Sequence, residues 1–120
     1  MDRATRRAVW KRAAGRCEIT GLRLGDRDGD GWECHHRRNK GMGGTDRPDV
    51  DSPANLLALS PAAHRAVHAS RAWAQPRGYL LSKNLPPEQD DPSMWPVFLS
   101  GRRWVLLTHS GGYAAIPTFS

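Results

Sequence analysis

The sequence predicts a small α+β fold with a basic N-terminal helix, two short strands followed by a second helix, and a β-hairpin near the C-terminus. Three observations predict it: helical spacing near the start, two short apolar stretches with a helix-capping signal after the second, and turn residues between apolar runs in the tail. The 120 residues suffice for one domain with a modest core. We expect this domain over residues 1–78, with a β-rich extension over residues 79–120 packed on it or flanking it.

The first helix is expected over Thr5 to Ala14, where Ala8, Val9 and Arg12 lie at helical spacing. Gly15 is placed to end it. Arginine and lysine recur through the same stretch, so this end of the chain is strongly basic.

Two turn-rich segments follow. Cys17 to Thr20 is expected to form a short strand, with Gly21 turning the chain. The aspartates of Gly25 to Gly31 imitate the start of an EF-hand loop, which needs a bidentate glutamate at its twelfth position. That position is Arg37, so we expect a solvated hairpin turn instead of a calcium site.

The central part of the chain predicts strand, loop, strand and helix in that order. Trp32 to His36 and Leu56 to Leu59 are the two strands, and Arg37 to Ser52 is a long ordered loop. Ser60 followed by Pro61 is a favourable helix start, with a hydroxyl at the N-cap and proline at the first helical position. This helix should run to about residue 73.

The tail differs in character. Pro86 to Pro92 is acidic and rich in proline, which is typical of a linker or surface loop. Val97 to Leu99 and Trp104 to Thr108 flank a Ser-Gly-Arg-Arg turn, which predicts a β-hairpin. Gly111 and Gly112 mark a second turn.

Charge and composition narrow the class of protein. The net charge of +6 and the isoelectric point near 10.1 favour a polyanionic partner. No apolar run reaches the roughly 18 residues of a membrane span, and the basic N-terminal stretch lacks the apolar core of a signal peptide. We therefore expect a cytoplasmic protein with no membrane partner, in which Cys17 and Cys34 are free thiols.

Four histidines fall into two pairs. His64 and His68 are four residues apart, so on a helix both can point at one ion. His35 and His36 are adjacent on a strand, and adjacent side chains point to opposite faces. One of them should therefore bind metal while the other faces the substrate, unless the strand end bends.

These residues suit the hydrolysis of a phosphodiester bond. Imidazole nitrogen binds divalent transition metals well, and three such ligands leave positions open for phosphate and water. A further histidine is a suitable general base. Each pair of histidines alone occurs by chance in many proteins, and the joint order of the motifs carries the hypothesis.

That order resembles the HNH endonuclease family. The sequence is most similar to those of the small HNH proteins of actinobacterial phages. The resemblance covers roughly Val9 to Arg71. Its motifs are Glu33-Cys34-His35-His36-Arg37, Lys40-Gly41-Met42-Gly43-Gly44, Ser52-Pro53-Ala54-Asn55-Leu56-Leu57-Ala58-Leu59, and then His64 and His68.

The resemblance implies a ββα-metal module, in which two strands and a helix surround one divalent ion. It implies that His36 is the general base and that the preceding His35 is a metal ligand. Asn55 would hydrogen-bond across the loop and hold the segment of the base. His64 would be a metal ligand, and His68 would match the additional helix ligand of colicin-type relatives. Magnesium, manganese, zinc and nickel are all candidate ions.

One feature of many family members is missing from the sequence. A structural zinc would need cysteines at positions 17, 20, 60 and 63. Only Cys17 is present, because the other three positions hold Thr20, Ser60 and Ala63, so we expect no structural zinc. The fold must then depend on packing of an apolar core. The expected core residues are Trp10, Trp32, Leu56, Leu57, Leu59, Val67 and Trp73.

Basic residues near the motifs are candidate contacts to nucleic acid. Arg37, Arg38 and Lys40 follow the expected base directly and should touch phosphate. Arg65 and Arg71 lie on the second helix and either contact the DNA backbone or lie in solvent.

The leading hypothesis is therefore a metal-dependent endonuclease that nicks DNA or cuts both strands, working beside phage terminase or portal proteins. The alternative is a non-catalytic DNA-binding or terminase-accessory protein. A third hypothesis is a zinc-binding structural module that uses Cys17, Cys34 and a histidine.

Overall fold

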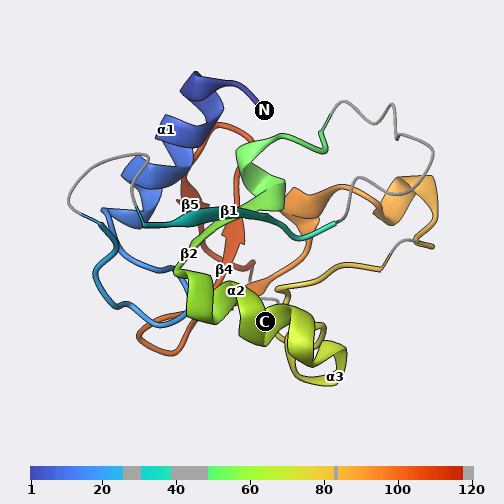
Figure 1. The fold of residues 1–120 in the computed structure, drawn as a ribbon. Helices are drawn as coiled ribbons and strands as arrows, with labels where there is room; N and C mark the ends of the chain where they lie inside the picture. The colour runs from blue at the N-terminus through green and yellow to red at the C-terminus, as the bar shows by residue number, and fades with distance from the viewer. Residues whose placement is uncertain (26–30, 39–48, 83, 118–120) are drawn as a thin grey trace.

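The computed structural model describes residues 1–25, 31–38, 49–82 and 84–117 (Figure 1). Its elements form a small α+β fold with two antiparallel sheets. In chain order they are α1 (Arg3–Ala13), β1 (Glu33–His36), η1 (Pro53–Asn55), β2 (Leu56–Leu59), α2 (Pro61–Ala69), α3 (Arg71–Ala74), η2 (Pro87–Gln89), η3 (Pro92–Met94), β3 (Val97–Leu99), β4 (Arg103–Leu107) and β5 (Tyr113–Ala114).

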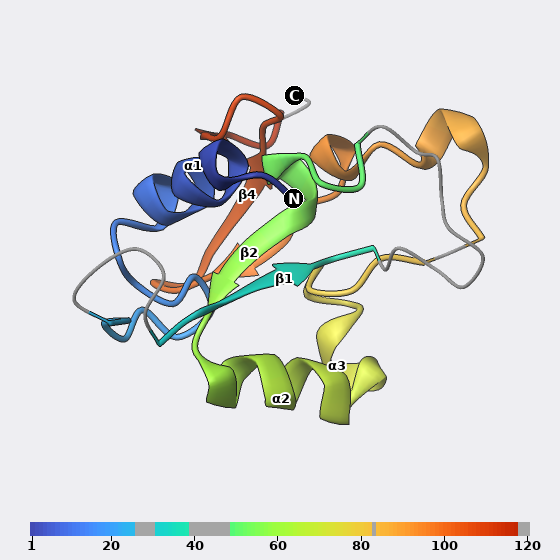
Figure 2. The same cartoon turned by 45° about the horizontal axis from the view of Figure 1, so that its top comes forward.

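The β1–β2 pair lies at the centre of the molecule. The two strands are antiparallel, with His35 opposite Leu57 and His36 opposite Leu56. Figure 2 shows α1 on one side of this pair and α2 on the other. All four residues of β2 are buried, because the strand is covered from both sides.

Helix α1 begins earlier than the sequence predicts because Asp2 caps it. The Asp2 carboxylate accepts a hydrogen bond from the backbone N–H of Thr5 at 2.8 Å, which satisfies one of the free donors of the first turn. The helix ends at Ala13, where Ala14 (φ 55°) and then Gly15 (φ 72°) turn left-handed.

The strand predicted over Cys17–Thr20 is wrong. This segment is a tight turn in which the N–H of Gly21 donates to the carbonyl of Cys17 at 2.8 Å. Just outside this turn, Arg16 and Arg23 form an isolated antiparallel bridge. The turn at Gly21 is confirmed by its φ of 76°. The aspartates of the EF-hand-like segment lie at positions 26–30, outside the described residues.

The predicted second helix is two helices. Ser60 accepts a hydrogen bond from the N–H of Ala63 at 3.1 Å and Pro61 is the first helical residue, as predicted. Ser70 then leaves the helical conformation (φ −145°, ψ 99°) and its hydroxyl caps α3 by accepting from the N–H of Trp73. The break follows because serine competes for backbone hydrogen bonds in non-helical geometry.

The C-terminal hairpin is confirmed. β3 pairs with β4 and β4 with β5, and both pairs are antiparallel. The turn between β3 and β4 contains Gly101 and Arg102, both with positive φ. The acidic, proline-rich segment before it carries the short turns η2 and η3, and Pro92 is buried. In the described ranges, none of the helices has the length and apolar character that a bilayer crossing requires.

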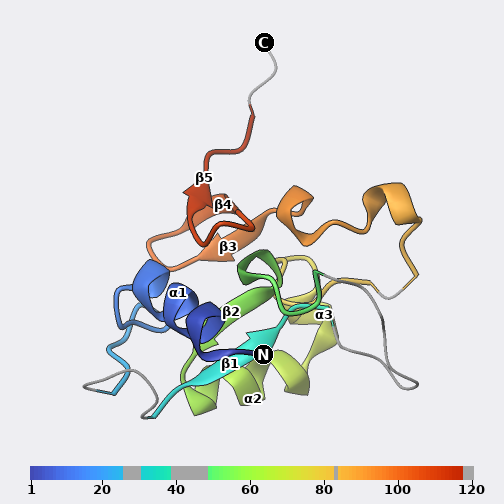
Figure 3. The ribbon, with the colours of Figure 1, turned by 90° about the horizontal axis from the view of Figure 1, so that it is seen from above.

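One apolar cluster joins both parts of the chain. The predicted core residues Trp32, Leu56, Leu57, Leu59 and Val67 are buried in it, and Trp10 and Trp73 are partly buried at its margin. Residues of the C-terminal sheet belong to the same cluster: Val97, Leu99 and Leu107. Figure 3 shows that this sheet and α2 lie on opposite sides of the β1–β2 pair.

A buried ion pair reinforces the junction of α1, β2 and β5. The Arg12 guanidinium donates to both carboxylate oxygens of Glu18, at 2.7 and 3.0 Å. Glu18 also accepts from the backbone N–H of Ala58 at 2.9 Å and from the hydroxyl of Tyr113 at 2.7 Å. These hydrogen bonds compensate the two buried charges, so the pair ties three elements together.

Candidate metal centre

Strand geometry sorts the side chains of β1 into two groups. Glu33 and His35 are two residues apart and share one face, while Cys34 and His36 share the other. His35 is buried, with rings of α2 beside it. The first face therefore supplies the strand's contribution to a site with α2.

Three histidines meet between β1 and α2. One ligand nitrogen from each of His35, His64 and His68 can be chosen so that all lie within 4.8 Å of one another. The ring centroids are 4.8 to 5.3 Å apart. Two zinc-bound nitrogens at tetrahedral positions lie about 3.3 Å apart, given Zn–N bonds of about 2.0–2.1 Å. The Nε2 atoms of His64 and His68 are 3.1 Å apart, so their spacing fits one shared ion.

The contacts of two rings identify which nitrogen is available. His35 donates from Nε2 to the carbonyl of Tyr79 at 2.7 Å, which leaves Nδ1 for an ion. His64 contacts the Glu33 carboxylate through Nδ1, which leaves Nε2. Burial lowers the pKa of His35 to about 4, against the opposing effect of its bond to Tyr79. The ring is therefore neutral at neutral pH, which is the form that binds metal.

Sequence reasoning missed Glu33 and Tyr79 as neighbours of the site. The alternation of side chains along β1 could have indicated Glu33, because it lies two residues before His35 and so points to the same face. The carbonyl of Tyr79 reaches His35 from 44 residues away, and no local pattern signals that contact.

His36 lies outside this group. Its Nε2 is 2.8 Å from a carboxylate oxygen of Asp51, and the N-terminal amine is 3.5 Å from the other oxygen of Asp51. About a fifth of the His36 side chain is exposed. The structure thus brings three of the four predicted histidines together, and it gives the fourth a carboxylate partner.

Asn55 joins the two described ends of the loop between the strands. Its side-chain N–H groups donate to the carbonyls of Val50 at 2.9 Å and Arg38 at 3.1 Å, and its oxygen accepts from the N–H of Arg38 at 2.9 Å. The residue is fully buried, so these bonds are shielded from water. They hold the backbone two residues beyond His36.

The predicted phosphate contact of Arg37 is wrong. Its side chain is fully buried and points into the protein, where it donates to four backbone carbonyls at 2.8 to 3.1 Å. Burial, and then the charge of Arg12, lowers its pKa to about 9. Arg37 is a structural cation that joins β1 to the segment before β3. The four carbonyls belong to Ala54, Gly78, Pro92 and Trp95.

Arg38 also turns inward, against the prediction. It forms ion pairs with Asp49 at 2.5 Å and Asp90 at 2.7 Å, and its side chain is buried. Lys40 lies outside the described residues. Arg65 and Arg71 are exposed on α2 and α3, so their predicted contact with DNA stays a prediction.

The two cysteines are free thiols, as predicted, and neither belongs to a metal-capable group among the described residues. Burial raises the pKa of Cys34 to about 11, which disfavours the thiolate that zinc requires. For Cys17, hydrogen bonds from Thr20, Ser60 and Ile19 outweigh burial and lower the pKa. Thr20 and Ser60 thus meet Cys17 in space, at positions where the resemblance would require thiolates.

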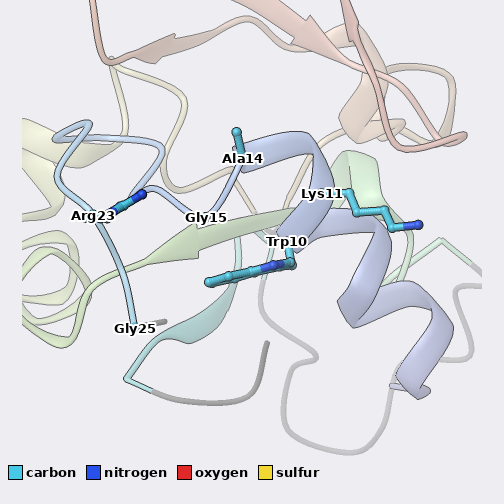
Figure 4. Close-up of a pocket in the computed structure, with 6 residues that line it drawn as sticks. All are labelled: Trp10, Lys11, Ala14, Gly15, Arg23 and Gly25. Carbon is cyan, nitrogen blue, oxygen red and sulfur yellow. The ribbon is translucent and has the colours of Figure 1, made fainter. Parts of the chain in front are cut away.

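A hollow of about 280 Å³ lies beside the end of α1, and none of the histidines lines it (Figure 4). Trp10 forms one wall, Arg23 is directed toward the helix end, and Lys11 is directed away from it. The lining residues are Trp10, Lys11, Ala14, Gly15, Arg23 and Gly25. The histidine group is therefore a separate surface site, open to solvent on the side of His68.

Comparison with family models, with curated proteins and with solved structures found no match for this chain. What the site can do chemically follows from its own residues and their geometry.

Proposed function

We propose that this protein is a metal-dependent endonuclease of the HNH type, which hydrolyses phosphodiester bonds in DNA. The observation that supports it is the convergence of His35, His64 and His68 from a strand and a helix. Three imidazoles are a suitable donor set for one divalent ion, and they leave coordination positions open. A divalent ion bound there would polarise a phosphate oxygen and stabilise the leaving oxygen.

In this proposal His36 acts as the general base. Asp51 accepts a hydrogen bond from Nε2 of His36, which fixes the tautomer and leaves the lone pair of Nδ1 for a proton from water. The carboxylate also stabilises the imidazolium that forms. Asn55 positions the chain immediately after His36 through its three hydrogen bonds.

The substrate class follows from charge. The net charge of +6 attracts a polyanion. Arg65 on α2 and Arg71 on α3 are exposed and could contact it. Contacts of this kind hold the phosphate backbone without reading bases. A single site of this kind cuts one strand per encounter, so nicking is the minimal activity.

Nicking of supercoiled plasmid, with a panel of divalent ions, tests the proposal. Wild-type protein should nick in the presence of an ion and stop on chelation, and His36→Ala should reduce the rate by at least about 10²-fold. His109→Ala is the matched control, because His109 is an exposed histidine outside the group. Nicking that survives chelation would contradict the proposal.

One observation favours a second candidate, a non-catalytic DNA-binding or terminase-accessory protein. His36 contacts Asp51 on the opposite face of β1 from His35. The proposed general base and the three metal-capable histidines therefore do not point at one common position. Under this alternative the protein binds both metal and DNA, and wild type and His36→Ala are equally inactive in the plasmid assay.

A further inference from the structure

Glu33 contacts the metal-capable group from outside it. Its carboxylate accepts a hydrogen bond from Nδ1 of His64. The other ring nitrogen of His64, Nε2, faces His68. The two side chains are partly exposed, with 45% of Glu33 and 24% of His64 accessible. The contact is therefore made at the rim of the site, on the side that α2 presents to the start of β1.

We propose that Glu33 is a positioning residue that holds His64 ready to bind a divalent transition-metal ion. A carboxylate can only accept a hydrogen bond, so Nδ1 of His64 must carry the proton and Nε2 must carry the lone pair. A carboxylate behind a ligating imidazole also raises the basicity of the ligand nitrogen. This inference rests on the metal site of the proposed function, although not on cleavage itself.

The same orienting device occurs twice in the site, with different chemistry. His35 donates to the carbonyl of Tyr79, which is backbone and cannot be removed by substitution. His64 is oriented by a side chain, which can. The prediction for the bound ion is a mixed set, with Nδ1 of His35 and Nε2 of His64 and His68.

The donor set also selects the class of ion. Three imidazole ligands suit late first-row ions such as zinc, nickel and cobalt, whereas magnesium prefers oxygen ligands. Glu33 adds a negative charge beside the site without offering its oxygens to the ion, because they lie on the far edge of the His64 ring. It should therefore strengthen binding of transition metals and do little for magnesium.

The experiment measures zinc and cobalt affinity of the full chain by competition with a chromophoric chelator, without DNA. Glu33→Ala should weaken binding by about 10- to 100-fold, in keeping with the loss of an outer carboxylate. Glu33→Gln keeps an acceptor of similar size and should recover part of the loss. Glu88→Gln, an exposed glutamate of η2, is the control and should bind like wild type.

Two further measurements distinguish a positioning role of Glu33 from a general structural role. The metal-free variants should unfold at the wild-type temperature, and the visible spectrum of bound cobalt should change in Glu33→Ala but not in Glu88→Gln. Zinc affinity of Glu33→Ala and Glu33→Gln within about twofold of wild type would overturn the inference, since an outer carboxylate changes it more. A wild type that binds zinc tightly but never nicks plasmid would overturn the proposed nuclease and leave this inference standing.

Discussion

The Nε2 atoms of His64 and His68 lie 3.1 Å apart on successive turns of α2. Because Nδ1 of His64 donates to Glu33, its Nε2 carries a lone pair and accepts a hydrogen bond from Nε2–H of His68. A bound cation would take the place of that proton between the two nitrogens. His35 approaches the same point from β1, with its ring centroid 5.0 and 5.3 Å from the other two. A cation bound at this point would link β1 to α2.

Zinc should therefore stabilise the folded protein. A ligand that binds only the folded state adds about 2.7 kcal/mol at a concentration one hundred times its dissociation constant. For a domain of this size we expect the melting temperature to rise by several degrees. His64→Ala should lose most of this shift and His109→Ala should keep it, as differential scanning fluorimetry can measure. Equal shifts in both variants would place the ion elsewhere.

Acid should destabilise the metal-free protein through His35. Burial lowers the pKa of His35 to about 4, so between its ordinary value of 6.5 and about 4 the unfolded chain binds a proton that the folded chain does not. Stability is thus full above pH of about 6.5 and falls as the pH drops toward 4, by an amount on the order of 3 kcal/mol.

Urea unfolding at several pH values measures this slope. Carboxylates contribute to acid denaturation as well, so the comparison is with His35→Gln, which cannot titrate at this position. The variant should have a shallower slope over the same range. An identical slope in both proteins would mean that His35 is already protonated in the fold.

Arg37 and Arg65 should respond in opposite ways to substitution. Arg37→Met leaves buried carbonyls without a donor, at a cost of about 1–3 kcal/mol for each that stays unsatisfied. Chemical denaturation should therefore show a loss of several kcal/mol or failure to fold. Arg65→Ala, an exposed position, should unfold like wild type.

DNA binding provides the other half of this comparison. If Arg65 contacts phosphate, Arg65→Ala should weaken binding similarly for all DNA sequences. The slope of log affinity against log salt concentration should also fall by about one. Fluorescence anisotropy in a salt series measures both quantities. Unchanged affinity and slope would assign Arg65 to solvent.

Asn55 should matter for stability and for nicking together. Asn55→Ala removes three buried hydrogen bonds and leaves the carbonyls of Val50 and Arg38 unpaired, so we expect a loss of about 2–4 kcal/mol. Nicking should fall even at temperatures where the variant is folded, because the chain after His36 is released. A stable variant with wild-type nicking would refute the positioning role.

Local signals predicted the elements that carry the site. The Ser60-Pro61 start, the spacing of His64 and His68 and the position of β2 are properties of neighbouring residues, and the structure confirms these elements. The helix break at Ser70 was missed because the apolar spacing continues through it, while the serine prefers to cap.

The fate of the arginines could not be predicted from sequence. Arg37 and Arg38 follow the histidines in a loop, where exposure is the usual expectation. They are buried because carbonyls of residues 78, 92 and 95 and the carboxylate of Asp90 close around them from the C-terminal part. Such long-range contacts leave no trace in local patterning, and the same holds for the carbonyl of Tyr79 at His35.

The most direct test of the central claim is the metal content of the full chain after equilibrium dialysis against zinc. We predict one ion for each wild-type chain and none for His64→Ala, because His64 is one of the three converging ligands. No bound zinc in the folded wild type, or an undiminished content in His64→Ala, would contradict the claim that these three imidazoles hold one ion.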